Sequence, residues 1–209
     1  MTTQILNSIK SIVKLNKEEE DAFLAILEIK QVKKKDFLLQ EGKICNKITF
    51  VNNGCFRIFF NVDGVENTVQ FFFQDSWYTD YTSLLTGLPT VENMQALENS
   101  EVVQFSQKDI YALYDKYPVF DRVGRVMAEN AFRSVARLNN MLVNEEPEQR
   151  YLSLLQKRPE VVERIPQHYI ASYLGVKPES LSRIRKRIFE RRRKEHFVVN
   201  RNCFHTFFF

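Results

Sequence analysis

The sequence is poor in the residues that mark exported, membrane-bound or cluster-binding proteins. Its 209 residues include three cysteines, Cys45, Cys55 and Cys203, and these form no CxxC pair. An odd number of scattered cysteines argues against a disulfide framework, and an iron–sulfur cluster needs four cysteine ligands or close substitutes. The sequence also lacks an export signal and a run of about 18 apolar residues. We therefore expect a cytoplasmic protein that does not cross a membrane.

Signatures of enzymes and cofactor sites are missing as well. The sequence has no GxSxG, HExxH, Walker or dinucleotide-binding motif, which are patterns that place a nucleophile, a metal or a phosphate. Its three histidines, His168, His196 and His205, all lie in the C-terminal part of the chain. We therefore expect neither catalysis nor a bound metal or cofactor.

The net charge of +4 is unevenly distributed along the chain. Residues 147–209 contain 14 Lys and Arg against 6 Asp and Glu, whereas residues 1–146 contain 16 basic and 20 acidic residues. A basic C-terminal module on a mildly acidic body suggests that the module binds a polyanion. The alternative is a solvated helical face that happens to be rich in Lys and Arg.

Hydrophobic periodicity separates helical segments from a strand-rich middle. Residues 3–28 carry apolar side chains at helical spacing. Between about 37 and 105, short runs rich in Phe, Val, Ile and Thr are broken by turn signals such as Asn-Gly (53–54) and Asp-Gly (63–64). We expect an antiparallel sheet there, curled into a barrel or roll so that its apolar face is covered. Ser106 is then a suitable N-cap for a short helix.

A long segment with a single glycine follows over residues 118–143. Apolar residues recur in it at spacings of three, four and seven, as in a seam between paired helices. This pattern predicts a dimerisation helix, although a helix packed on its own roll fits the same spacing. The predicted seam residues, interrupted by the polar Ser134, are Phe120, Val123, Met127, Leu138 and Met141.

Residues 166–188 have the spacing of two short helices joined by a tight turn. The first helix, about 166–174, must end sharply, and Gly175 permits this because glycine adopts positive φ without steric cost. Ala171 is small enough for the second helix to cross closely. Pro178 suits the first turn of that helix, where its missing N–H needs no partner. Together these features predict a helix-turn-helix.

The second predicted helix is apolar on one side and polar on the other. At 100° per residue, its polar side collects Glu179, Ser182, Arg183 and Lys186. Arginine bonds guanine in a bidentate manner, glutamate accepts from cytosine, and serine and lysine hold phosphates. The alternative is an ordinary helical hairpin with a charged surface. The predicted DNA-contacting residues are Gln167, His168, Lys177, Glu179, Ser180, Ser182, Arg183, Lys186 and Arg187.

In this order, a β-roll, a long helix and a helix-turn-helix resemble the cyclic-AMP receptor protein/Fnr (Crp/Fnr) family of bacterial transcription regulators over nearly the whole chain. The resemblance implies an α+β fold with three parts. These are a cyclic-nucleotide-binding-type β-roll at 1–117, a dimerisation helix at 118–143, and a helix-turn-helix DNA-binding domain, winged or wingless, at 144–209.

The same resemblance assigns roles on the recognition helix. Glu179 and Arg183 correspond to the family's base-reading pair, and the serines at 180 and 182 correspond to phosphate contacts. Pro178 replaces the arginine with which the family's recognition helix commonly begins. No glycine occurs after Gly175, although the family's β-wing usually contains one.

In cyclic-nucleotide-binding relatives, the roll carries a Gly-Glu segment for the ribose and an Arg-Ser/Thr pair for the cyclic phosphate. The corresponding positions here are Thr79-Asp80 and Thr90-Val91, which implies a degenerate pocket. No arginine occurs from 58 to 121, although a buried phosphate needs a charge-assisted donor. We therefore expect no response to cyclic AMP. Aromatic residues of this region, which fit either a ligand site or ordinary core, are Trp77, Tyr78 and Tyr81.

Taken together, these patterns predict a homodimeric transcription regulator that reads a palindromic site. Its expected partners are double-stranded DNA and a second copy of the chain, with RNA polymerase as a further candidate. One alternative is a small-molecule-binding module whose helix-turn-helix only packs or dimerises. The other is a nonspecific polyanion binder driven by the basic run at 183–194. An aromatic tail at 204–209 is expected to pack on its own domain or on a dimer partner.

Overall fold

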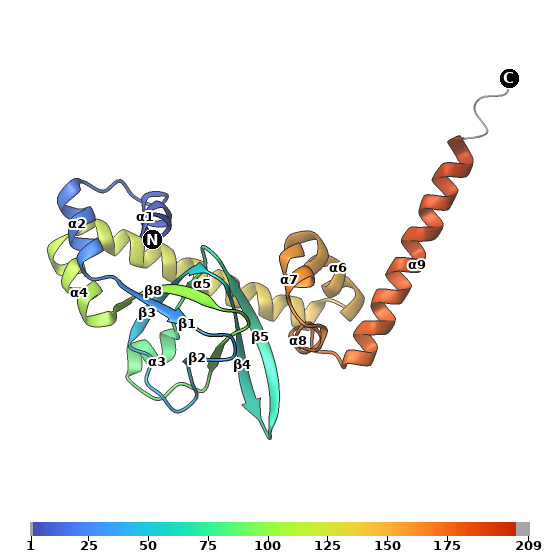
Figure 1. The fold of residues 1–209 in the computed structure, drawn as a ribbon, viewed down its shortest axis with the longest axis horizontal. Helices are drawn as coiled ribbons and strands as arrows, with labels where there is room; N and C mark the ends of the chain where they lie inside the picture. The colour runs from blue at the N-terminus through green and yellow to red at the C-terminus, as the bar shows by residue number, and fades with distance from the viewer. Residues whose placement is uncertain (1, 204–209) are drawn as a thin grey trace. The chain divides into compact units, whose positions relative to one another are not determined.

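The structure is a computed structural model that describes residues 2–203 (Figure 1). The chain divides into two compact units, Met1–Val143 and Asn144–Phe209. No helix in the described part of the chain is long and apolar enough to span a bilayer. The aromatic tail at 204–209 lies outside the described residues.

Two short helices open the first unit, α1 (Thr3–Lys10) and α2 (Lys17–Ala25). The helical periodicity of residues 3–28 is thus interrupted, because Asn16 starts a new helix with a capping box. Its side chain accepts from the Glu19 N–H at 3.0 Å, and the Glu19 carboxylate accepts from the Asn16 N–H at 2.8 Å. The first strand already begins at Glu28, earlier than the sequence pattern predicts.

Eight strands in the described residues form two four-stranded antiparallel sheets, ordered β1-β8-β3-β6 and β2-β7-β4-β5. The predicted turn at 63–64 joins β4 to β5, with φ of 52° at Asp63 and 79° at Gly64. The strands are β1 (Glu28–Val32), β2 (Phe37–Leu39), β3 (Lys47–Asn53), β4 (Cys55–Val62), β5 (Val65–Phe73), β6 (Trp77–Tyr78), β7 (Asn93–Ala96) and β8 (Ser100–Ser106).

Alternation along β3 separates two hydrophobic cores. Val51 lies between the two sheets in a cluster with side chains of β4, β7 and β8, including Phe56 and Met94. The neighbouring Phe50 points to the other face of its sheet and packs against the helices. Figure 1 shows α1, α2 and α4 (Gln107–Lys116) together at that side of the roll. The α4 helix begins as the sequence predicts, since the Ser106 hydroxyl accepts from the Asp109 N–H at 3.1 Å.

The long helix α5 (Val119–Asn144) completes the first unit. Two of its predicted seam residues are already covered within one chain, because Phe120 is 0% exposed and Val123 is 5% exposed in the helix-side core. Met127 is partly buried against the same core. Assigning Phe120 and Val123 to a helix–helix seam is therefore a wrong prediction, because both side chains face the chain's own roll. Met127 stays partly exposed, so its part in a dimer stays a prediction. Leu138 and Met141 are half-buried, and their part in a dimer stays a prediction.

The second unit is helical in its described residues. Its elements are α6 (Pro147–Lys157), α7 (Pro159–Arg164), α8 (Gln167–Tyr173) and α9 (Pro178–Cys203). The segment at 197–199, which could have supplied a wing strand, is part of α9. No β-wing therefore follows the second helix within residues 178–203, which is consistent with the lack of glycine there.

Candidate nucleic-acid interface and degenerate ligand pocket

The turn between α8 and α9 has the geometry that the sequence predicts. Gly175 adopts a φ of 67°, and its N–H donates to the Ser172 carbonyl at 2.9 Å. The Val176 N–H donates to the Ala171 carbonyl at 2.9 Å. These bonds end α8 in the way typical of a glycine-stopped helix. Ala171 is fully buried, so a larger side chain at this position would keep the two helices apart.

Over residues 179–188, the apolar side of α9 packs inward and most of its polar side is exposed. Leu181, Ile184 and Ile188 are all less than 10% exposed, which orients the opposite side of the helix toward solvent. Most of the predicted DNA-contacting residues are exposed, namely Gln167, His168, Lys177, Glu179, Ser182, Arg183, Lys186 and Arg187. Ser180 is half-buried. The joint contact of these residues with DNA stays a prediction.

Arg187 differs from the other predicted contacts because it has an acidic partner within its own unit. Its Nε lies 3.4 Å from one carboxylate oxygen of Glu148, and Nη1 of Arg191 lies 3.0 Å from the other. Both arginines remain more than half exposed. Glu148 of α6 therefore ties the middle of α9 to the domain. Sequence reasoning did not find Glu148, since no local spacing connects residues 148 and 187.

Hydrogen bonds from Arg150 hold the end of α8, and sequence reasoning did not find this residue either. Nη1 of Arg150 donates to the Leu174 carbonyl at 2.7 Å, and its Nε donates to the Glu145 carbonyl at 2.9 Å. The guanidinium thereby supplies a hydrogen-bond donor to one of the last carbonyls of α8. Arg150 therefore helps to position the turn between α8 and α9 through the Glu145 and Leu174 carbonyls.

The residues predicted as remnants of a nucleotide pocket are used for local structure. The Thr79 hydroxyl donates to the Lys47 carbonyl at 3.1 Å. Asp80 caps α3 (Tyr81–Thr86) by accepting from the Ser83 N–H at 3.1 Å. Thr90 is buried, and its hydroxyl accepts from the Glu92 N–H at 3.0 Å. Val91 is 64% exposed and does not line the interior.

Acidic groups occupy the neighbourhood of these remnants. The Tyr78 hydroxyl donates to the Glu92 carboxylate at 3.0 Å. Burial raises the pKa of Glu92, and the nearby Asp80 raises this pKa further. Burial and the Glu92 charge raise the pKa of Tyr78 as well. Two carboxyl groups, those of Asp80 and Glu92, therefore lie in the region of the remnant residues.

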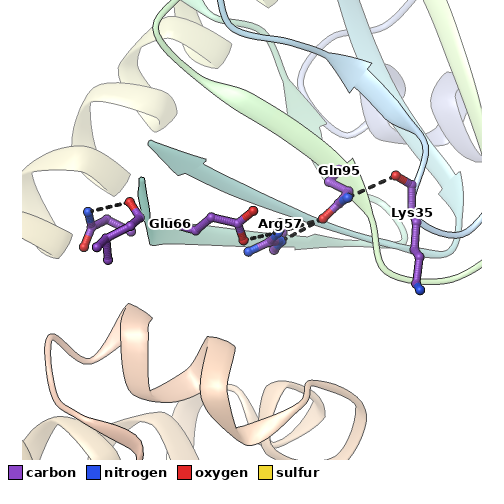
Figure 2. Close-up of polar contacts among 6 residues, drawn as sticks. Lys35, Arg57, Glu66 and Gln95 are labelled. Carbon is purple, nitrogen blue, oxygen red and sulfur yellow. Dashed lines mark hydrogen bonds and ion pairs between the residues drawn. The ribbon is translucent and has the colours of Figure 1, made fainter. Parts of the chain in front are cut away.

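Arg57 is the nearest arginine before the arginine-free stretch, and it is 2% exposed. It alternates along β4 with Phe56 and Ile58, which both lie in the core between the sheets, so its side chain points to the other face of its sheet. Figure 2 shows its guanidinium between Glu66 and Gln95. The Nη2 donates to Glu66 at 2.6 Å and to Gln95 at 2.7 Å.

The guanidinium of Arg57 also lies 4.0 Å from the centre of the Phe59 ring. The positively charged group therefore contacts the Glu66 carboxylate, the Gln95 amide and the face of the Phe59 ring. Gln95 donates in turn to the Lys35 carbonyl at 3.0 Å, which extends the network to the next loop (Figure 2). Arg57 thus links the paired strands β4 and β5 through Glu66 and reaches β7 through Gln95.

Comparisons with known proteins agree with this architecture. The family model of the cyclic nucleotide-binding domain matches residues 29–117. No curated protein sequence matches the chain. Among solved structures, FixK2 from Bradyrhizobium japonicum is similar at a TM-score of 0.68 and 15% identity, covering 79% of this chain and 86% of that one.

Two further structures extend the likeness. The c-di-GMP-responsive global regulator CLP from Xanthomonas campestris has a TM-score of 0.64 and 16% identity, covering 84% of this chain and 92% of that one. A structure described as a crp/fnr-family transcriptional regulator from Eubacterium rectale has a TM-score of 0.64 and 16% identity, covering 81% and 82%. Residues 29–117 therefore match the cyclic nucleotide-binding domain, and most of the chain shares the fold of these solved structures.

Proposed function

We propose that the protein is a DNA-binding transcription regulator that binds a palindromic site as a homodimer, without control by cyclic AMP. The observation that carries this proposal is the free polar face of α9. It presents Glu179, Ser182, Arg183 and Lys186 from a helix whose opposite side is buried. The unit that holds it, residues 144–209, contains 14 basic and 8 acidic residues, which suits a polyanion.

The chemistry of this face separates base reading from phosphate binding. The Arg183 guanidinium suits the O6 and N7 of guanine, and the Glu179 carboxylate suits the amino group of cytosine. Lys186, one turn after Ser182, suits phosphates on the same helical face. Arg187 would reach a phosphate only by weakening its ion pair with Glu148. Its contribution to affinity should therefore be smaller than that of Lys186.

A stripe on α5 supports dimerisation, and it differs from the seam that the sequence pattern predicts. All its members are exposed in the single chain, and they recur at alternating spacings of four and three, as in a coiled-coil seam. Asn139 is its polar member, and a buried asparagine in such a seam fixes register. We call this set the α5 stripe: Ala128, Phe132, Val135, Asn139 and Leu142.

A dyad along α5 implies a two-fold-related pair of α9 helices. Two such helices would enter successive major grooves, so half-sites should be centred about one helical turn apart. The likeness to FixK2 and CLP supports this arrangement at the level of the fold. Independence from cyclic AMP is supported by the carboxyl groups of Asp80 and Glu92 beside the remnant pocket and by the orientation of Arg57.

Selection of bound sites from a random duplex pool at physiological salt, with and without cyclic AMP, tests the proposal. We expect an enriched palindrome that is the same in both pools. Arg183→Ala should cost about 1–3 kcal/mol at one base pair and relax its sequence preference. Lys186→Ala should weaken all sequences alike and reduce the salt dependence of binding.

Arg193→Ala provides the matched control, because it removes one exposed positive charge from the same helix, almost three turns after Arg183. It should not change the preferred base at any position. An Arg183→Ala protein that keeps full sequence discrimination would contradict the assigned base contact. Absence of any enriched sequence would favour a nonspecific polyanion binder instead.

A further inference from the structure

The first unit contains a pocket of about 250 Å³ on the helical side of the roll. Its walls come from α3, α4 and the N-terminal third of α5, and its floor includes Phe105 and Ile110 from the helix-side core. Leu85 and Tyr111, at 64% and 44% exposure, line the pocket from α3 and α4 and mark its open side. The residues that line it do not include Thr79, Asp80, Thr90 or Val91.

Three tyrosines, Tyr81, Tyr111 and Tyr114, line this mostly apolar pocket together with two charged residues. The Tyr111 hydroxyl already accepts from Gln107 at 3.3 Å. The hydroxyls of Tyr81 and Tyr114 have no hydrogen-bond partner among residues 2–203. Burial raises the pKa of Tyr114 to about 12 and raises that of Tyr81 too, so both hydroxyls stay protonated donors near neutral pH.

Gly124 explains how Tyr114 reaches this position. A Cβ built on Gly124 would lie 2.4 Å from the Tyr114 hydroxyl oxygen. Glycine is unfavourable inside a helix, and here it makes room for the hydroxyl against the α5 backbone. A polar hydroxyl is thereby held at the wall of an apolar pocket.

The charged residues that line the pocket leave no spare positive charge. Arg125 is paired with Glu129 at 2.6 Å, and Asp121 lies close enough to Tyr114 to raise its pKa. An anionic ligand would therefore gain little. The volume is somewhat below the roughly 300–1,000 Å³ of pockets for drug-sized ligands, so it suits a molecule of one or two rings.

We propose that this tyrosine pocket binds an uncharged aromatic molecule of one or two rings whose carbonyl oxygen accepts from the hydroxyls of Tyr81 and Tyr114. The rings would replace water along Phe105, Ile110 and Leu85. This inference rests on the proposed function: in a DNA-binding regulator, the pocket would be the site for an effector. Its α5 wall includes Gly124 and Ala128, and Ala128 is the first residue of the α5 stripe.

The probe for this test is 6-propionyl-2-dimethylaminonaphthalene, an uncharged two-ring ketone whose fluorescence shifts to the blue in apolar, water-poor sites. Titration of the full chain without DNA should show saturable one-to-one binding, with a dissociation constant of about 10–100 µM. Loss of both hydroxyls in Tyr81→Phe/Tyr114→Phe should weaken binding at least about five-fold. Gly124→Ala should also weaken it, because the new methyl group displaces Tyr114 while improving helix propensity.

The matched control is Tyr117→Phe, which removes a hydroxyl bonded to Glu18 outside the pocket and should leave probe affinity unchanged. Circular dichroism melting of each variant establishes that the fold is retained. Nonsaturable probe binding, or equal affinity in the double variant and the wild type, would overturn the proposal. Site selection by the same protein preparation separates the two hypotheses, since an enriched palindrome without probe binding contradicts only the pocket. Probe binding without sequence enrichment contradicts only the regulator.

Discussion

Replacing Val135 with aspartate should separate the two copies of the chain. Val135 lies in the middle of the α5 stripe, away from the face of α5 that carries Phe120 and Val123 into the roll. The substitution therefore leaves the core of the single chain intact. A change in association would therefore come from the contact between two copies and not from a less stable roll.

The expected magnitude follows from exposure. Val135 exposes 67% of its surface in the single chain. Full burial of a valine stabilises by about 1.5 kcal/mol, so covering this fraction contributes about 1 kcal/mol per chain and about 2 kcal/mol per dimer. Each unpaired aspartate in the interface adds a desolvation cost of roughly 1–3 kcal/mol. The dimer dissociation constant should rise at least about 100-fold, since about 1.4 kcal/mol corresponds to ten-fold.

Sedimentation equilibrium over a range of protein concentrations measures this constant directly. Asn130→Asp is the matched control, because it adds the same negative charge to an exposed position nearly opposite the stripe at 100° per residue. This variant should associate like the wild type. If Val135→Asp and wild type have equal dissociation constants, or if the wild type is monomeric at all concentrations, the α5 stripe is not the dimer interface.

Three further substitutions test the roll. Glu66→Ala should lower the free energy of unfolding by about 1–2 kcal/mol in urea denaturation, because it removes the carboxylate that pairs with the buried Arg57. The effect is moderate because Glu66 itself is half exposed. Unchanged stability would contradict a stabilising ion pair. Burial raises the pKa of Glu92 above its ordinary 4.5, so the stability that its proton confers is complete below about pH 4.5 and is lost as pH rises through the folded pKa. Glu92→Gln keeps an acceptor for Tyr78 and should melt at a higher temperature than wild type at about pH 7 and at the same temperature at about pH 4; a lower melting point at pH 7 would refute this. Gly54→Ala should destabilise by about 1–3 kcal/mol in the same urea assay, because φ is 109° and the new Cβ would lie 2.8 Å from the Ser100 Cα; a wild-type midpoint would argue against that geometry.

Local features were predictable because neighbouring residues produce them. Gly175 with its positive φ, Pro178 at the start of α9 and the Ser106 cap each depend on a few adjacent positions. The two faces of α9 follow from its period alone, and Leu181 and Ile184 are indeed buried. The order of roll, long helix and helix-turn-helix could therefore be read from the chain, as could its family resemblance.

The assignment of Phe120 and Val123 to a seam between two copies failed because two apolar faces share one helix. Periodicity identifies positions that prefer burial, but it does not say whether the roll or another chain buries them. Phe120 and Val123 pack on the roll, whereas Phe132 and Val135 remain exposed. The break near Asn16 was missed for a related reason, since apolar spacing continues across a capped interruption.

The sequence by itself determined the elements, the tight helix-turn-helix and the lack of a phosphate-binding arginine within 58–121, because these are properties of short segments or of composition. Only the tertiary structure decided which side of its sheet Arg57 occupies, that Glu92 lies beside Asp80, and that Tyr114 reaches Gly124 to line a pocket. These relations join residues from different strands and helices. Burial and electrostatic coupling depend on distances that appear only when the segments pack.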